Sequence, residues 1–387
     1  MKSIVITTDV FRGSEFCMPS VSENVHWLRG LLHNVFSTTG FVQTIFTNER
    51  EGGRFALAHY RESHALLKSA CSWAKLVNTK ISLEDESYFT ELLNAELVVG
   101  WGLTPALMEL LDRHRISFFD VDVDPIRFGD DLLLRVRTNN SHLSDFFSSL
   151  HVDEVFFSTS VAELRAFVAR REAATVRTDR SIGLFAGQCR IDLSTVESGR
   201  IVRPAERLKE ISEVAQNVDT LFIKPHPLER EAHHLATLLD AIPNARMTRS
   251  NIYRILSDVN LKHVIALSSS VLDEAAMFGV ETTRLMDPDR DASDLIPSSV
   301  SQWYRIPSEE LTHEGFVNAF FGIVSPRYNI PRRRLDLRRS LNTAWGFKDF
   351  YNQADLSLSV VPHRPAKSSF PHRKVHRALK SIFRPKH

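Results

Sequence analysis

The chain has 387 residues, which is long for one domain and typical of two, and its 43% hydrophobic residues are enough to bury sizeable cores. A formal net charge of +1 argues against a dedicated nucleic-acid-binding protein. The three cysteines lie far apart and lack the spacing of a zinc site or a disulfide framework, so we expect neither.

The first residues do not resemble a signal peptide, because the apolar run at residues 4–8 is short and typical of a buried strand. No stretch approaches the roughly 20 apolar residues of a transmembrane helix. We therefore expect a soluble protein of the reducing cytoplasm.

The first half of the chain alternates between strand and helix patterns. Short apolar runs predict strands at residues 4–8, 41–47, 97–102, 116–119 and 132–136. Helical spacing predicts a helix from about Ser20 or Ser22, a mostly helical region at 54–93, and helices at 105–114, 141–150 and 160–174. This rhythm is typical of a doubly wound domain with a parallel sheet.

After a polar linker at residues 171–180, the second half repeats the rhythm. Strands are predicted at residues 182–185, 220–224, 245–247, 263–267 and 281–285. Helices are predicted at residues 204–216, 228–240, 251–257 and 270–278. After Pro288 the pattern weakens, and residues 338–351 predict one terminal helix that folds back on the first domain.

We therefore expect an α/β protein with two doubly wound, Rossmann-like domains that face a cleft. The expected boundaries are 1–175 for the N-terminal domain, 176–337 for the C-terminal domain, 338–355 for the returning helix and 356–387 for a basic tail. The dinucleotide fingerprint G-x-G-x-x-G follows none of the predicted strands, so a nicotinamide enzyme is not expected.

Three polar clusters of the second half each follow a predicted strand, the position where open α/β sheets bind ligands. The most specific is Lys224-Pro225-His226-Pro227, in which the prolines fix His226 in a rigid turn beside Lys224. A Lys/His pair there can neutralise a phosphate. The alternative is a surface turn with a chance histidine.

The second cluster is Ser268-Ser269-Ser270, which opens a predicted helix. Hydroxyls and free backbone N–H groups suit an anion, although serine is also the favoured helix cap. Glu274 lies in the first turn of that helix, where it can complement the helix dipole or accept a hydrogen bond from a ribose hydroxyl.

The third cluster pairs Gln188 with Asp192 after the strand at 182–185. A carboxylate beside a phosphate-binding wall can act as a nucleophile or a base. The structural alternative, a turn-forming or helix-capping aspartate, is favoured by these residues alone.

The first half offers two further sets of candidates. Asp120, Asp122 and Asp124 follow a predicted strand and are candidates for acid/base work, because like charges raise one another's pKa values, or else form a solvated acidic loop. Candidates for acceptor binding across the cleft are Asp9, Arg12 and Glu15.

The sequence Lys-Pro-His-Pro, followed by a strand that ends in Ser-Ser, resembles the His-Pro and Ser motifs of bacterial glycosyltransferases that use CMP-activated ketoses. Gln188-x-x-x-Asp192 and Asp124-Pro125-Ile126-Arg127-Phe128-Gly129 make the chain most similar to the retaining β-Kdo transferases of capsule, O-antigen and lipopolysaccharide assembly. The resemblance covers roughly residues 1–350 and is strongest in the second half.

This resemblance implies a GT-B-like fold and transfer from CMP-β-Kdo by double displacement. Asp192 would be the nucleophile, and Lys224, His226, Ser268 and Ser269 would hold the CMP phosphate or the donor carboxylate. Neither a cofactor nor a metal is implied. The family's acid/base residue has no clear counterpart, and the region of residues 120–124 is our prediction for it. The chain lacks the fused second transferase of multidomain members.

Three rival functions stay open. An inverting CMP-sialic acid transferase would use Asp192 as a base, whereas a CDP-glycerol glycerophosphotransferase would hold a diphosphate with the same clusters. A non-catalytic glycan-binding protein is suggested only by the tail, because residues 361–387 hold basic and no acidic residues. Such a tail either contacts an anionic inner-membrane surface peripherally or is a solvated segment without a specific role.

Overall fold

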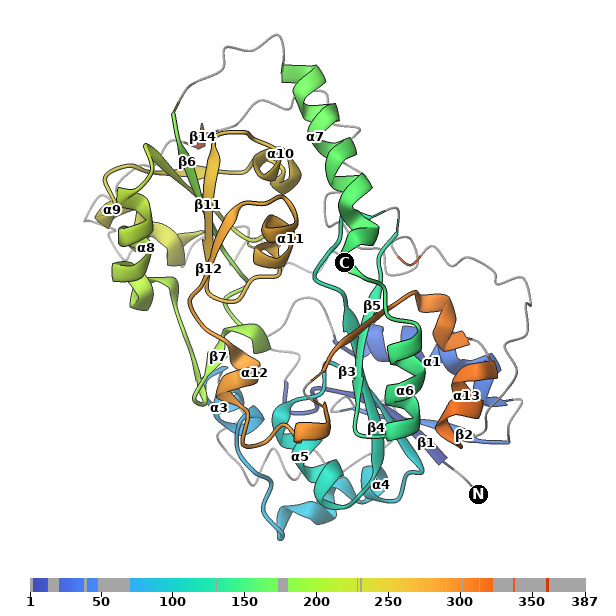
Figure 1. Cartoon of the computed structure of the whole chain (residues 1–387). Helices are drawn as coiled ribbons and strands as arrows, with labels where there is room; N and C mark the ends of the chain where they lie inside the picture. The colour runs from blue at the N-terminus through green and yellow to red at the C-terminus, as the bar shows by residue number, and fades with distance from the viewer. Residues whose placement is uncertain are drawn as a thin grey trace, which may run out of the picture.

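The computed structural model describes residues 3–12, 21–37, 40–47, 70–129, 131–172, 180–227, 229, 232–300, 302–312, 314–322, 337 and 360–361. These residues form two six-stranded sheets with helices around them, in separate lobes (Figure 1). The architecture is mixed α/β with largely parallel sheets, and it is compatible with a Rossmann-like fold.

The first sheet has the strand order β13-β5-β4-β3-β1-β2. The strands are β13 (Tyr304–Ile306), β5 (Leu134–Thr138), β4 (Ser117–Val123), β3 (Leu97–Trp101), β1 (Ser3–Thr8) and β2 (Val42–Phe46). The pairs from β4 to β2 are parallel, whereas β5 is antiparallel to both β4 and β13. The sheet is therefore parallel at one side and antiparallel at the other.

The second sheet has the order β12-β11-β6-β9-β10-β14. The strands are β12 (Glu281–Arg284), β11 (Leu261–Ala266), β6 (Ile182–Ala186), β9 (Thr220–Lys224), β10 (Ala245–Thr248) and β14 (Val360–Val361). All of its pairs are parallel except that of β10 with β14. The parallel strands end at one edge, and the polar clusters follow them there.

Both faces of each sheet are covered, as the apolar runs of the strands require. Alternate residues of a strand point to opposite faces, so Ile4 and Ile6 join one core while Val5 joins the other. Helices cover each face, with α1 and α6 opposite α5 in the first lobe and α7 and α11 opposite α8 in the second (Figure 1).

The α-helices of the first lobe are α1 (Val21–Ser37), α3 (Ala70–Val77), α4 (Thr90–Leu93), α5 (Pro105–Arg113), α6 (Ser141–Ser149) and α13 (Glu314–Phe320). The others are α7 (Ser158–Glu172), α8 (Leu208–Gln216), α9 (Ala236–Ala241), α10 (Ile252–Leu256), α11 (Val271–Met277) and α12 (Pro288–Asp291). Helix α5 shows why sequence predicts such elements well, because Thr104 caps it by accepting from the Leu107 N–H and Pro105 occupies its first turn.

Two details differ from the sequence-based expectations. Strand β4 continues to Val123, so Asp120 and Asp122 lie within a strand and not in a loop after it. In place of one helix over residues 228–240, the short 3-10 helix His233–Leu235 precedes α9. The other predicted strands that fall on described residues are present within a few residues of their expected ends.

The chain returns to the first sheet earlier than expected. Strand β13 pairs with β5 and helix α13 joins the core of the first lobe, before residue 338, where we placed the return. Residues 360–361, within the expected tail, pair with β10. The helix predicted at 338–351, the helical region before residue 70 and the rest of the tail lie outside the described residues.

Candidate functional site

Three neighbouring strands of the second sheet bring the predicted clusters together. Strand β6 pairs in parallel with β9 on one side and with β11 on the other. The turn after each strand therefore opens at the same edge, as the sequence predicted. The backbones approach closely there, because the Gly187 N–H donates to the Lys224 carbonyl at 2.8 Å and a Cβ on Gly187 would lie 2.9 Å from that oxygen.

Gln188 connects the third cluster, to which it belongs with Asp192, to the serine cluster. Its Oε1 accepts from the Ser268 N–H at 2.9 Å, and its Nε2 donates to the Ser268 Oγ at 3.0 Å and to the Ser194 Oγ at 2.9 Å. The Ser268 hydroxyl in turn donates to the Ser194 carbonyl. The hydrogen bonds of Gln188 and Ser268 thus hold the loop that carries Asp192 in place.

Asp192 caps the 3-10 helix Leu193–Thr195, which is the structural role anticipated for it. Its Oδ1 accepts from the Ser194 N–H at 2.9 Å and from the Ser194 hydroxyl at 2.7 Å. Its Oδ2 has no hydrogen-bond partner among the described residues. The carboxylate is therefore held by one oxygen while the other is available, which is compatible with a chemical role as well as with capping.

His226 lies against Cys189 of the neighbouring loop. The His226 Nδ1 is 3.2 Å from the Cys189 Sγ. Burial lowers the pKa of His226 and, with Asp192 and Glu229 nearby, raises the pKa of the Cys189 thiol to about 12. The thiol is therefore protonated at neutral pH and can donate to the imidazole, which fixes the ring.

Lys224 is half-buried, and its ammonium group has no carboxylate partner among the described residues. Burial and the neighbouring charge of Arg249 lower the pKa of Lys224 to about 8. No hydrogen bond or ion pair of its ammonium group is found among the described residues. Burial removes water from the ammonium group without supplying an opposite charge. The charged form is therefore destabilised until an anion binds.

Arg249 follows β10 at the same edge and was not among the predicted residues. The rule that ligand-binding side chains follow parallel strands would have found it. With Lys224 it forms the cationic part of the site.

The other two serines and Glu274 lie at the start of α11. The Ser269 Oγ accepts from the Val271 N–H at 3.4 Å, whereas the Ser270 side chain makes no capping bond. Glu274 is buried, and its Oε1 accepts from the Arg127 N–H at 2.9 Å and the Tyr253 hydroxyl at 3.0 Å. Burial raises the pKa of Glu274 to about 7. Glu274 thus joins the two lobes, and its predicted contact with a ribose stays a prediction.

The aspartates of the first sheet are bonded to arginines. The pairs are Asp120 with Arg137 at 3.2 Å, Asp122 with Arg135 at 2.6 Å and Asp124 with Arg305 at 2.8 Å. Burial raises the pKa of Asp120 to about 6, although the Arg137 charge and the Leu103 N–H oppose that effect. These ion pairs give each aspartate a structural role. The acid/base role of the aspartates stays a prediction.

Two arginines of this region also stack on one tryptophan. The guanidinium carbons of Arg135 and Arg137 lie 4.4 and 4.1 Å from the ring centre of Trp303. Arg137 contacts Asp289 as well, at 3.4 Å. The first-sheet cluster is therefore a packed, internally paired network.

Asp9 and Arg12 connect the first sheet to the loop of Asp192. Asp9 is buried and accepts from the Trp73 Nε1 at 2.7 Å and the Phe11 N–H at 3.0 Å, and burial raises its pKa to about 6. The Arg12 guanidinium lies 5.7 Å from the Trp73 ring centre and donates to the Ile191 carbonyl at 3.0 Å. The structure therefore brings Arg12 next to Asp192, whereas Glu15 lies outside the described residues.

Within the described ranges, no cluster of three or more His, Cys, Asp or Glu side chains has the arrangement of a metal site. None of the helices in those ranges is both long and apolar enough to span a bilayer.

Comparison with known proteins adds little. No family model and no curated protein matches the chain. It is similar to KpsC of Thermosulfurimonas dismutans, a beta Kdo 2,7 transferase, with a TM-score of 0.36 and 15% identity over 82% of this chain and 99% of that one. A periplasmic solute-binding protein of an ABC transporter from Actinobacillus succinogenes 130z, with bound D-allose, gives a TM-score of 0.24 and 10% identity over 89% and 100%. Neither likeness is strong enough to carry an argument about activity.

Proposed function

We propose that the protein is a retaining glycosyltransferase that transfers Kdo from CMP-β-Kdo to a cell-surface glycan or glycolipid. One observation carries this proposal. Among the described residues, a half-buried lysine without a carboxylate partner and an aspartate with one unbonded oxygen follow two paired strands of the second sheet. The first suits an anionic leaving group, and the second suits attack on an electrophilic carbon.

The leaving group is the CMP phosphate. Lys224 and Arg249 supply positive charge, and the hydroxyls of Ser269 and Ser270, which follow β11 at the same edge of the sheet, complete the contacts. Charge that develops on the departing phosphate is best stabilised by fixed cations and hydrogen-bond donors. His226, neutral because burial lowers its pKa, supplies a hydrogen bond and no charge.

Asp192 forms the covalent intermediate. Its Oδ2 attacks the anomeric carbon, the bond from that carbon to the phosphate oxygen breaks, and its electron pair leaves with CMP. An acceptor hydroxyl then attacks the same carbon, expels the Asp192 carboxylate and gives its proton to a base. Two inversions at one carbon retain its configuration.

The proposal includes a GT-B-like arrangement of the two lobes, and three contacts support it. The Arg12 bond to Ile191 and the Arg127 bond to Glu274 join the lobes at the site, and helix α3 lies beside the hairpin of β7 (Val196–Glu197) and β8 (Arg200–Ile201) (Figure 1). An acceptor held by the first lobe would thus meet the donor near Asp192.

A panel of activated donors tests this function. The purified chain is incubated with CMP-Kdo, CMP-sialic acid or CDP-glycerol and a glycan acceptor, and released nucleotide is measured with and without EDTA. We expect turnover with CMP-Kdo only, unchanged by EDTA because protein cations hold the phosphate. Turnover with CMP-sialic acid or CDP-glycerol alone would replace the proposal by one of those two rivals.

A further inference from the structure

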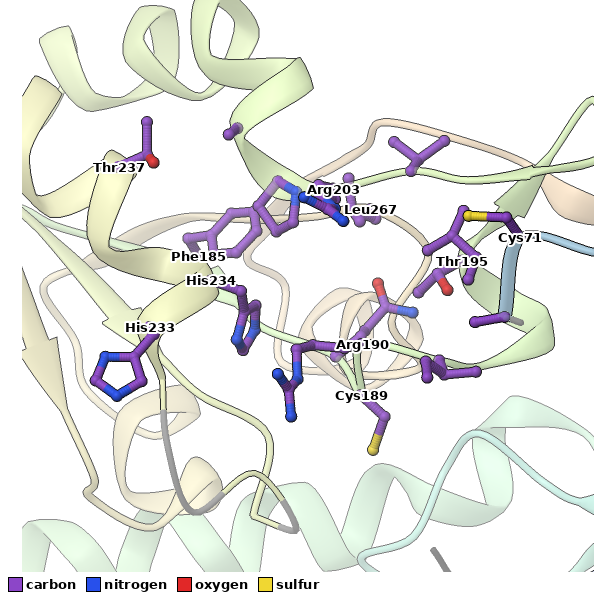
Figure 2. A pocket seen from close by; sticks show the side chains of 17 residues that line it. Cys71, Phe185, Cys189, Arg190, Thr195, Arg203, His233, His234, Thr237 and Leu267 are labelled. Carbon is purple, nitrogen blue, oxygen red and sulfur yellow. The ribbon is translucent and has the colours of Figure 1, made fainter. Parts of the chain in front are cut away.

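A cavity of about 630 Å³ is lined in part by the loop that carries Asp192. Its walls come from residues 188–191, from the 3-10 helix Pro204–Arg207, from His233–Leu235 with the start of α9, and from Ala70 and Cys71 of α3 in the other lobe (Figure 2). This volume is in the range of pockets for small ligands. Gln188, which bonds to Ser268, and Cys189, which contacts His226, both line it. The cavity therefore adjoins the donor site, although Lys224, His226 and the three serines are not among its lining residues.

The cavity is lined by basic side chains. They are Arg190, Arg203, His233 and His234, and no aspartate or glutamate of the described residues lines it. Arg190 is partly neutralised, since its Nε lies 3.3 Å from a Glu229 oxygen. The Arg203 guanidinium has no carboxylate partner in the described part of the chain, so the cavity has a cation available for an anion.

His234 has two ring nitrogens that are shielded from water. Neither has a hydrogen-bond partner among the described residues. Burial lowers the pKa of His234, so the neutral ring offers one donor and one acceptor. An unmade hydrogen bond in a protein interior is costly. Hydroxyl groups of a ligand, reached by a small rotation of the ring, would remove that cost.

The rest of the wall is mainly apolar and includes the side chains of Ile191, Ile201, Val202, Pro204 and Leu267, while Gln188, Thr195 and Thr237 add polar groups. Figure 2 shows Arg203, Leu267, His234, Arg190 and Thr195 arranged around the open space. A ligand that fits has an apolar face, several hydroxyls and a negative charge. A pyranose ring with a carboxylate has all three, because its C–H groups form an apolar face.

We propose that this cavity binds an acidic saccharide, namely a carboxylate-bearing segment of the acceptor glycan. This inference rests on the proposed transferase function. The carboxylate pairs with Arg203, the hydroxyls pair with His234, and the ring lies on the apolar wall. Because Gln188 belongs to both the cavity and the donor site, and Ala70 and Cys71 of the first lobe complete the wall, an acceptor segment held here contacts both lobes close to the loop of Asp192.

Calorimetric titration of the full chain tests the site without requiring turnover. The probes are trigalacturonic acid and the neutral maltotriose, each with and without saturating CMP. We expect trigalacturonic acid to bind at least about ten times more tightly than maltotriose and CMP not to compete. The changes Arg203→Glu and His234→Phe should each weaken trigalacturonic acid at least about tenfold and leave the affinity for CMP within about twofold.

Arg246→Glu is the matched control, since Arg246 is an exposed arginine on β10 away from the cavity, and it should leave binding unchanged. Bound trigalacturonic acid should also protect the exposed Cys71 from alkylation, as measured by peptide mass spectrometry. Equal binding of both sugars, or unchanged binding in both cavity variants, would overturn the inference. Competition by CMP would make the cavity part of the donor site instead. Saccharide binding as expected, with no CMP-Kdo turnover, would leave the site standing and remove the transferase.

Discussion

The polar edges of the two sheets differ in how their charges are paired. At the first sheet, each of three aspartates contacts an arginine, and Asp120 and Arg137 are both almost fully buried at 1% and 5% exposure. At the second sheet, Lys224 has no carboxylate and one oxygen of Asp192 has no partner among the described residues. Both edges are rich in charge, but the three aspartates of the first edge are paired with arginines, whereas Lys224 of the second has no carboxylate partner among the described residues.

This difference separates charge that organises the fold from charge that can meet a ligand. Buried ions that already have partners make the folded state dependent on both members of the pair. Ions without partners destabilise the apo protein slightly and gain from a ligand. We therefore propose that the chemistry takes place at the second sheet, and the variants below test that proposal.

The largest expected effect is on turnover. Asp192→Asn should lower turnover of CMP-Kdo at least about 10³-fold, because an amide cannot act as the nucleophile. The amide can still accept from Ser194, so the loop and the affinity for CMP should change little. Asp112→Asn is the matched control in the first lobe, because the Asp112 carboxylate accepts from Asn139 and is not a site candidate, and turnover by that variant should change less than about twofold.

Arg137→Met should lower the free energy of unfolding by about 3–5 kcal/mol, because it leaves the Asp120 carboxylate buried without its cation. Urea unfolding measures this change. The double variant Arg137→Met with Asp120→Asn should recover part of the loss, since no lone charge is then buried. If Arg137→Met left stability unchanged and abolished CMP binding, the first edge would be part of the site and the comparison would fail.

Lys224→Met should have the opposite effect to Arg137→Met, because it should weaken CMP binding without lowering stability. The affinity for CMP should fall about 10- to 100-fold, since a charge-assisted bond contributes roughly 1.5–3 kcal/mol, while the thermal midpoint should not fall. Lys262→Met, on the exposed part of β11, is the control and should change neither quantity. A loss of stability without a loss of affinity would show that Lys224 is structural.

The smallest expected effect is a dependence of CMP affinity on pH. Because the pKa of Lys224 is lowered to about 8, its ammonium loses its proton as the pH rises through that value, and affinity should fall severalfold between pH 7 and pH 9. The CMP phosphate is already fully charged over this range, since its second pKa is about 6. Lys224→Arg should bind CMP with little dependence on pH because arginine keeps its charge. A flat profile in the unmodified chain would contradict the role of Lys224.

Much of the fold could be predicted because its strands are short apolar runs that local pattern reveals. The position of the three clusters followed from that pattern, since parallel strands end at one edge. The extension of β4 was missed, although Asp120 and Asp122 match Arg137 and Arg135 across the strand pair with the same spacing of two. Pairing of β13 with β5 has no local signal, because three residues are too few to show a period.

The site could be predicted in its residue types but not in its bonding. The sequence places Lys224 and His226 after a strand, but whether Lys224 meets a carboxylate depends on contacts distant in the chain. The bonding of Asp192 could not be predicted either. Only the three-dimensional structure shows that one carboxylate oxygen caps a helix and that the other has no partner among the described residues. Arg203 and His234 carried no sequence signal, because the cavity between them is formed by segments of both lobes.

The covalent intermediate is the central claim, and intact-mass spectrometry tests it most directly. The chain is mixed with CMP-Kdo without acceptor, quenched in acid and weighed, and the modified peptide is then mapped. We predict a mass increase of one Kdo residue located on Asp192 and absent from Asp192→Asn. Turnover with acceptor but no adduct in the quenched sample, or an adduct on another residue, would contradict the account.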